Sequence, residues 1–235
     1  MEIFGKTYGQ PCPIARTLDV LGDRWTLLII REFLLGPKRF KDLLAVLPAM
    51  GTNRLSSRLN LLVTNDVIQR TAGKNSIAYE LTERGEGLRR PVMGLGQWGL
   101  SLPLEIVGDF SGLRAELIAM SLSGIRNPAA YDGLPDVYEF EVGHEIFHIF
   151  VQNNEIITRS GRCAAGADVK IILDIESFIA LIARKITVDA AIGTGRCTLR
   201  QGEKQAVARI FQVLEHGEWL PAFEQVGKRQ AIIES

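Results

Sequence analysis

Apolar residues in the first part of the chain recur at every third or fourth position, which is the spacing of an amphipathic helix. Three such stripes lie over residues 13–21, 25–35 and 40–47, and each is followed by a glycine or a proline. Pro13 suits the first turn of its helix, and Gly22 suits the position just past the end. The pattern therefore predicts three short helices before residue 48.

A fourth helix is predicted behind a short turn at residues 48–51. Thr52 is the expected N-cap residue, and leucines occupy the inward positions 55, 59 and 62. The outward side chains are hydrogen-bonding or basic, and no acidic residue occurs from Ala49 to Asn65. Two short amphipathic helices joined by a Gly-containing turn are typical of a helix-turn-helix, whose second helix enters the major groove of DNA.

Two alternating segments follow this helix. Residues 67–71 and 77–81 are predicted strands, and the segment between them is rich in Gly, Asn and Ser, as in a hairpin turn. The hairpin forms a wing, with Arg70 and Lys74 near its tip, where they meet phosphate or the minor groove. Thr82 then caps a closing helix. This order of elements predicts a winged helix-turn-helix that is mainly α-helical.

The hydropathy period changes to two from residue 137 onward. Five segments show the alternation or the short apolar runs of strands: residues 137–142, 147–151, 156–158, 169–173 and 197–200. Helices are predicted before the first strand, after the fourth and after the fifth. Strands in one layer with helices on one side predict an α+β fold. We expect two domains, residues 1–107 and 108–235, with a hinge at residues 108–112.

Charge differs between the two halves, although the formal net charge of the whole chain is zero. Residues 1–105 hold 14 basic and 10 acidic side chains, and residues 106–235 hold 13 and 17. The positive surplus in the first half favours a polyanionic partner such as double-stranded DNA. No apolar run is long enough to cross a membrane, no secretory signal is evident, and three widely spaced cysteines make no disulfide framework. These features predict a cytoplasmic protein without a membrane partner.

Motifs of the first half resemble those of the HxlR-type helix-turn-helix regulators. They are Cys12-Pro13-Ile14-Ala15, Gly22-Asp23-Arg24-Trp25-Thr26-Leu27-Leu28-Ile29, Leu35-Gly36-Pro37-Lys38-Arg39-Phe40 and Leu81-Thr82-Glu83-Arg84-Gly85. The resemblance covers about residues 10–100. It implies a transcription regulator that forms a homodimer through the first and last helices of this domain. Two recognition helices would then enter successive major grooves, ~34 Å apart.

The predicted DNA contacts are polar or basic side chains, of the types that bind base edges and phosphates. They are Arg39, Thr52, Asn53, Arg54, Ser56, Ser57, Arg58, Arg70 and Lys74. Some members of the family sense oxidants or electrophiles with a cysteine near the position of Cys12. A thiol at a helix N-terminus has a lowered pKa and is therefore more reactive than an ordinary thiol. Cys12 is therefore a candidate redox residue; in the alternative interpretation it is a small side chain that only packs.

Short motifs of the second half resemble the sterol-carrier-protein fold. They are Ala167-Asp168-Val169, Asp174-Ile175-Glu176-Ser177-Phe178, Asp189-Ala190-Ala191 and Gly195-Arg196-Cys197-Thr198-Leu199. The resemblance implies an apolar tunnel for a hydrophobic small molecule. Phe140, Phe147, Phe178 and Leu181 are candidate lining residues, and all four also suit plain core packing. The favoured function is sequence-specific DNA binding biased by such an effector, without cofactor or metal; in one alternative the second domain is only structural.

A second alternative is an enzyme. His144-Glu145-Ile146-Phe147-His148 matches the H-E-x-x-H pattern of zinc metallopeptidases. That chemistry needs both histidines on one face of a helix and the glutamate beside the metal-bound water. Here Gly143 precedes the motif and alternating segments flank it, so His144 and Glu145 are expected in a hairpin turn. The pattern therefore disfavours a zinc hydrolase, and we expect no catalytic residues.

Overall fold

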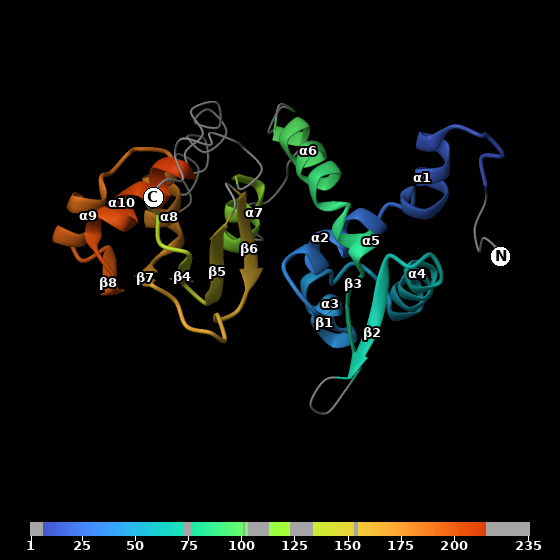
Figure 1. The fold of residues 1–235 in the computed structure, drawn as a ribbon, viewed down its shortest axis with the longest axis horizontal. Helices are drawn as coiled ribbons and strands as arrows, with labels where there is room; N and C mark the ends of the chain where they lie inside the picture. The colour runs from blue at the N-terminus through green and yellow to red at the C-terminus, as the bar shows by residue number, and fades with distance from the viewer. Residues whose placement is uncertain are drawn as a thin grey trace, which may run out of the picture. The chain divides into compact units, whose positions relative to one another are not determined.

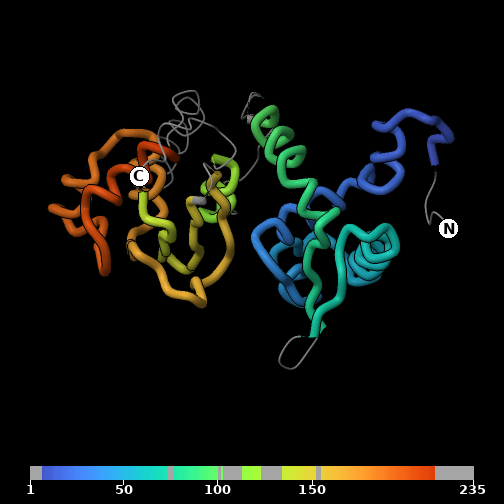
Figure 2. The backbone as a smooth tube through the Cα atoms, in the orientation of Figure 1, coloured from blue at the N-terminus to red at the C-terminus, as the bar shows by residue number. Residues whose placement is uncertain are grey.

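A computed structural model describes residues 7–72, 77–100, 102, 113–122, 134–152 and 155–214. They fold into two compact units that divide between Val92 and Met93 (Figures 1 and 2). Helix α6 (Arg89–Leu100) begins in the first unit and ends in the second. The hinge expected at residues 108–112 lies outside the described residues, so the domain limits at 107 and 108 stay a prediction.

The first unit has the predicted order of a winged helix-turn-helix. Its helices before the wing are α1 (Pro13–Leu21), α2 (Thr26–Leu34), α3 (Phe40–Val46) and α4 (Thr52–Thr64). The wing consists of β2 (Ile68–Ala72) and β3 (Ile77–Leu81), and β1 (Lys38–Arg39) pairs with β3 to give an antiparallel sheet of order β1-β3-β2. Strand β1 was not expected, because two residues are too few to show an alternating pattern.

Two helix boundaries differ from the expectation. Thr52 is the first residue of α4, and Gly51 takes the N-cap position with an extended backbone. The closing helix is divided into α5 (Glu83–Glu86) and α6, because the chain turns at residues 87–88.

Gly85 is required by the close approach of α5 to the residue before the wing. A Cβ atom on Gly85 would lie 2.0 Å from the carbonyl oxygen of Val67. Thr82 holds the two segments together: its N–H donates to the Val67 carbonyl at 3.1 Å, and its hydroxyl donates to the Asp66 carbonyl at 2.6 Å. The same hydroxyl accepts a hydrogen bond from the Gly85 N–H at 3.0 Å. The predicted N-cap role of Thr82 is thus confirmed. Glycine is required at position 85 because a side chain there would clash with the Val67 carbonyl.

Apolar side chains of α2, α3 and α4 form the core of the first unit. The fully buried ones include Ile29, Ile30, Phe33, Leu34, Leu43, Leu55, Leu59 and Leu62. Each such side chain contributes roughly 1.5–3 kcal/mol when it leaves water. Helix α1 contributes only Ala15 and Leu21 to the buried residues. The other apolar residues of its stripe are therefore not buried in this core.

The second unit is built on a five-stranded sheet of order β6-β5-β4-β7-β8. Its strands are β4 (Val137–Val142), β5 (Glu145–Gln152), β6 (Glu155–Ser160), β7 (Val169–Leu173) and β8 (Cys197–Gln201). Strands β4 and β7 pair in parallel, and the other neighbours are antiparallel. The five predicted strands are confirmed, and with the helices they make an α+β unit.

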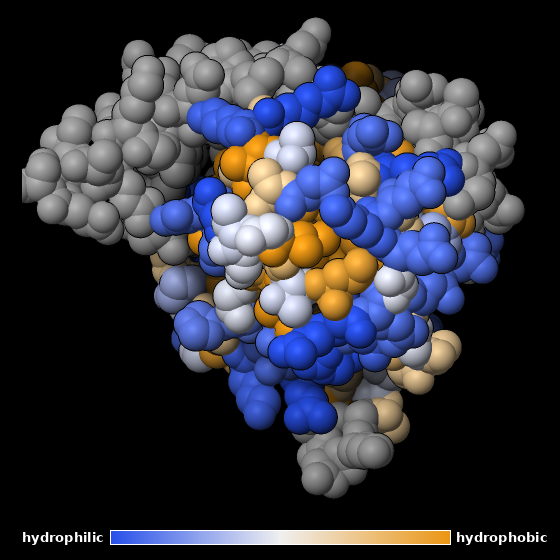
Figure 3. Space-filling view, turned by 90° about the vertical axis from the view of Figure 1, so that its left-hand side faces the viewer, coloured by the Kyte–Doolittle hydropathy of each residue, from blue (hydrophilic) through white to orange (hydrophobic). Residues whose placement is uncertain are grey.

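Four helices pack against the apolar face of this sheet, and Figure 1 shows them beside the strands. They are α7 (Ala115–Leu122), α8 (Ile175–Ile182), α9 (Val188–Gly193) and α10 (Lys204–Val213). On the face of the molecule shown in Figure 3, apolar residues gather in the middle and hydrophilic residues surround them. Among the described residues of both units, no helix combines the length and the apolar character needed to span a membrane.

Candidate nucleic-acid interface

Helix α4 presents a polar face opposite its buried leucines. Leu55, Leu59 and Leu62 are buried and fix the orientation of the helix. Six exposed side chains lie away from them: Thr52, Asn53, Arg54, Ser56, Ser57 and Asn60. They offer hydroxyl, amide and guanidinium groups and no carboxylate. These groups pair with base edges and phosphates, so the arrangement is chemically suited to a DNA groove.

A tight turn sets α4 against α3. Met50 in this turn is buried, and its N–H donates to the Leu47 carbonyl at 2.9 Å. At the other end of α3, the Arg39 N–H donates to the Asp42 carboxylate at 3.0 Å, which fixes the first turn of that helix. Arg39 itself is half-buried and pairs with Ala78 of the wing. Its side chain therefore lies where the helix-turn-helix meets the wing.

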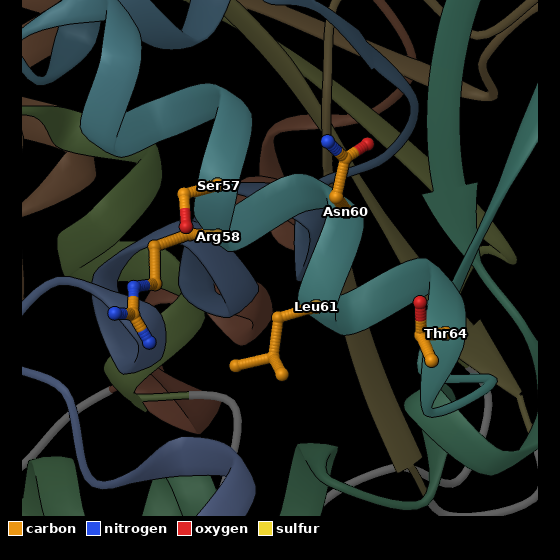
Figure 4. Close-up of a pocket in the computed structure, with 5 residues that line it drawn as sticks. All are labelled: Ser57, Arg58, Asn60, Leu61 and Thr64. Carbon is orange, nitrogen blue, oxygen red and sulfur yellow. The ribbon is translucent and has the colours of Figure 1, made fainter. Parts of the chain in front are cut away.

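The loop between α1 and α2 supports one flank of α4. An Nη of Arg58 lies 3.5 Å from the carboxylate of Asp23, whose other oxygen accepts a hydrogen bond from the Trp25 N–H at 3.1 Å. The ion pair holds the Arg58 guanidinium beside this loop, and its predicted contact with DNA stays a prediction. A hollow of about 400 Å³ on α4 is lined by Ser57, Arg58, Asn60, Leu61 and Thr64. In Figure 4, Arg58 and Leu61 point to one side of the helix and Asn60 points away from them.

The other flank of α4 faces the wing. An Nη of Arg70 on β2 donates a hydrogen bond to Oδ1 of Asn60 at 3.0 Å. The sequence placed Arg70 near the wing tip, but this contact puts its guanidinium at the junction of helix and wing. A signal was present in the sequence: Arg70 is two positions from Ile68, a buried residue, and alternate residues of a strand share a face. Lys74 lies outside the described residues.

Large apolar side chains are exposed on the two helices of the expected dimer interface. On α1, Ile14 is 71% exposed and Leu18 is 42% exposed; on α6, Leu95 is 53% exposed and Trp98 is 64% exposed. Isolated exposed apolar residues are common, but several on one helix face are typical of an interaction surface. Cys12 is the N-cap residue of α1, and it is also exposed.

The candidate pocket residues of the second unit pack against one another. Phe140 and Phe147 are stacked with their ring centroids 5.2 Å apart, and Phe178 meets both rings edge-on at 6.0 and 5.9 Å. These residues and Leu181 are buried in one core. In this structure they therefore fill the space between sheet and helices where a tunnel was expected. A tunnel lined by them stays a prediction.

The H-E-x-x-H residues do not have the geometry of a metallopeptidase. His144 lies in the turn before β5 as expected, whereas Glu145, also expected in the turn, is the first residue of the strand. Glu145 and His148 are three positions apart on β5, so they face opposite sides of the sheet. The Glu145 carboxylate accepts a hydrogen bond from the Glu116 N–H at 3.1 Å, whereas Nδ1 of His148 lies 2.7 Å from the Gly161 carbonyl oxygen. Burial raises the pKa of Glu145 above its usual value. Within the described part of the chain, no cluster of three or more potential ligand residues could hold a metal.

Comparison with known proteins finds similarity to helix-turn-helix transcriptional regulators. The profile of the HxlR-like helix-turn-helix family matches residues 20–103. An HTH-type transcriptional regulator of Synechocystis sp. is 32% identical over 94 residues, which are 39% of this chain and 70% of that protein. The HTH-type transcriptional regulator YodB of Bacillus subtilis is 32% identical over 91 residues, or 37% of this chain and 81% of YodB.

A further comparison concerns solved structures. The inverting sec-alkylsulfatase Pisa1 from Pseudomonas sp. superimposes with a TM-score of 0.42 at 18% sequence identity, and the match covers 46% of this chain and 17% of the sulfatase. A likeness at this level supports no conclusion about activity. The resemblance of the second unit to the sterol-carrier-protein fold therefore stays a prediction.

Proposed function

The chain belongs to the HxlR family of helix-turn-helix transcriptional regulators, and we propose that it recognises a specific DNA sequence with α4 in the major groove. The observation that carries the proposal is the exposed face of α4, which holds six hydrogen-bonding or basic side chains and no acidic one. In this proposal Asn53, Arg54, Ser56 and Ser57 meet base edges or nearby phosphates. Thr52 and Arg39 meet the DNA backbone, as does Lys74.

The proposed active form is a homodimer. The exposed apolar residues of α1 and α6 support it, because each would leave water in an interface between two copies. A two-fold axis between the copies would present two α4 helices to successive major grooves, ~34 Å apart. An operator with two half-sites related by a two-fold axis is then expected.

For the second unit we propose an apolar small-molecule effector, and the support is the resemblance to the sterol-carrier-protein fold. An effector regulates only if it binds the DNA-competent and DNA-incompetent forms with different affinity, typically by ~1–3 kcal/mol. The close packing of Phe140, Phe147 and Phe178 favours a second candidate, in which this unit holds no ligand. An apolar fluorescent probe that binds the full chain at one site per protomer would support the effector, and no binding would support the structural role.

Cys12 is the proposed redox residue, and its exposure at the start of α1 supports the proposal. Oxidation there would act on the helix that carries part of the proposed dimer interface. The test compares DNA binding before and after peroxide treatment in the wild type and in Cys12→Ser. If both proteins respond equally, Cys12 has no redox role.

The main experiment measures binding of the full chain to a fluorescent duplex from its own upstream region and to a random duplex, over a series of salt concentrations. We expect the preference for the upstream duplex to persist as salt rises, because base contacts are less salt-dependent than phosphate contacts. Arg54→Ala should weaken binding to the upstream duplex by ~1–3 kcal/mol if Arg54 contacts a base. Arg84→Ala on α5, also exposed, is the matched control. Equal binding of both duplexes by the wild type would contradict sequence-specific recognition.

A further inference from the structure

We propose that Asn60 is a positioning residue that holds the guanidinium of Arg70 against a DNA backbone phosphate. The inference rests on the proposed function, because it assumes that α4 lies in the major groove. It assigns Asn60 a role other than reading a base, although its side chain lies on the exposed, polar side of the recognition helix. It also assigns the phosphate contact to the junction of helix and wing, in addition to the wing tip.

The direction of Arg70 follows from the geometry of β2. Side chains alternate along the strand, so Arg70 lies on the same face as Ile68, which is buried beneath α4. Arg70 is two positions after Ile68 and lies beyond the edge of the core, where it is exposed. Its long side chain therefore reaches the exposed surface of α4. The 3.0 Å hydrogen bond from Arg70 to Asn60 is the result.

The chemistry of the pair favours a phosphate as the third partner. A guanidinium has five N–H donors in a planar fork, and the contact with Asn60 uses one of them. Bidentate recognition of adenine by an asparagine needs both its amide oxygen and its amide nitrogen in one orientation. The hydrogen bond from Arg70 uses one of the two acceptor sites of the Asn60 oxygen and orients the amide toward the wing. A helix in the major groove has a phosphate backbone along each side, and Arg70 stands beside α4 on the wing side.

The neighbouring residue on β2 provides a matched control. Gln69 is also exposed, and its Nε2 donates to the Glu80 carboxylate at 2.8 Å. Gln69 lies on the opposite face of the wing from Arg70, because consecutive strand residues alternate. Gln69→Ala therefore removes a surface hydrogen bond of the same kind without touching the junction.

The test is a double-mutant cycle with the full chain: wild type, Asn60→Ala, Arg70→Ala and the double variant, with Gln69→Ala as control. Affinities for a random duplex and for the upstream duplex are measured by fluorescence anisotropy at several salt concentrations, and thermal melting checks that each variant is folded. Arg70→Ala should lower the slope of log K against log salt by about 0.9 for each protomer that loses a phosphate contact. Asn60→Ala should weaken binding about two- to ten-fold in the wild-type background and have no further effect in the Arg70→Ala background.

Three results would overturn the inference: an unchanged salt slope in Arg70→Ala, additive losses in the double variant, or an Asn60→Ala loss confined to the upstream duplex, which would make Asn60 a base reader. Failure of the proposed function is a separate result, namely equal wild-type affinity for upstream and random duplexes. The cycle remains informative in that case, because phosphate contacts are measured on random DNA.

Discussion

Replacing Gly85 by alanine tests the close contact that joins α5 to the start of the wing. The added Cβ would stand 2.0 Å from the Val67 carbonyl oxygen and 3.0 Å from Cδ2 of Leu81. A carbon atom normally approaches a carbonyl oxygen to about 3.3 Å. Helix α5 must therefore move by about 1.3 Å, and the three hydrogen bonds that Thr82 makes to Val67, Asp66 and Gly85 have to stretch.

The cost of the substitution can be worked out from these contacts. Overpacking of this kind costs about 1–3 kcal/mol, and each weakened hydrogen bond adds roughly 0.5–1.5 kcal/mol. The higher helix propensity of alanine offsets at most about 1 kcal/mol of this loss in stability. We therefore expect the first unit to lose about 2–4 kcal/mol of its free energy of unfolding. For a unit of this size that is a fall of about 10 °C or more in melting temperature.

The assay is calorimetric melting of the full chain, with the transition of the first unit identified by its response to added DNA. Gly193→Ala on α9 is the control, because a Cβ there has nothing within 4 Å. The control should leave both transitions nearly unchanged. If Gly85→Ala melts within 2 °C of the wild type, the approach of α5 to Val67 is looser than described and the steric account of the motif is wrong.

Three further changes test other parts of the structure. Leu18→Asp places a charge in the proposed interface, so light scattering should show monomers, and a persistent dimer would exclude α1 from the interface. Asp66 follows the C-cap of α4 and has a left-handed backbone with φ of 54°, so Asp66→Gly should raise the melting temperature of the first unit by relieving about 0.5–1 kcal/mol of strain; a lower value would contradict this. Burial raises the pKa of Glu145 above 4.5, so the native state holds its proton more tightly and stability falls as pH rises from 4.5 into the raised range. Glu145→Gln should lessen that fall in a melting series against pH, and an identical pH profile would refute the assignment.

Most elements of the fold could be predicted, because their apolar residues repeat with a clear period. The strands of the second unit alternate along one buried face, and the leucines of α4 repeat at helical spacing. Strand β1 and the break at residues 87–88 were missed because each involves two residues, too few for a period. The N-cap of α4 was placed one residue too late, at Thr52, because Gly51 provides the extended N-cap backbone without a side-chain hydrogen bond.

The contacts of the candidate site were harder to predict than the elements. The residue types on α4 follow from the sequence, but the ion pair of Arg58 with Asp23 and the hydrogen bond of Arg70 with Asn60 join segments that only the tertiary fold brings together. The stripe of α1 shows a related ambiguity. Apolar spacing predicts that Ile14 and Leu18 leave water, but it does not tell a core from an interface between copies.

The parallel pair of β4 and β7 makes the second unit slow to fold relative to the wing. It aligns Tyr138 with Val169, whereas the wing hairpin closes between Ala72 and Ile77. Closing a long loop costs entropy before the strands can pair, so non-local pairing lowers the folding rate. Domains generally fold in order of synthesis, starting from the N-terminus. A nascent chain is therefore expected to complete its DNA-binding unit before β7 has been made, and to acquire DNA affinity before the unit proposed to modulate it.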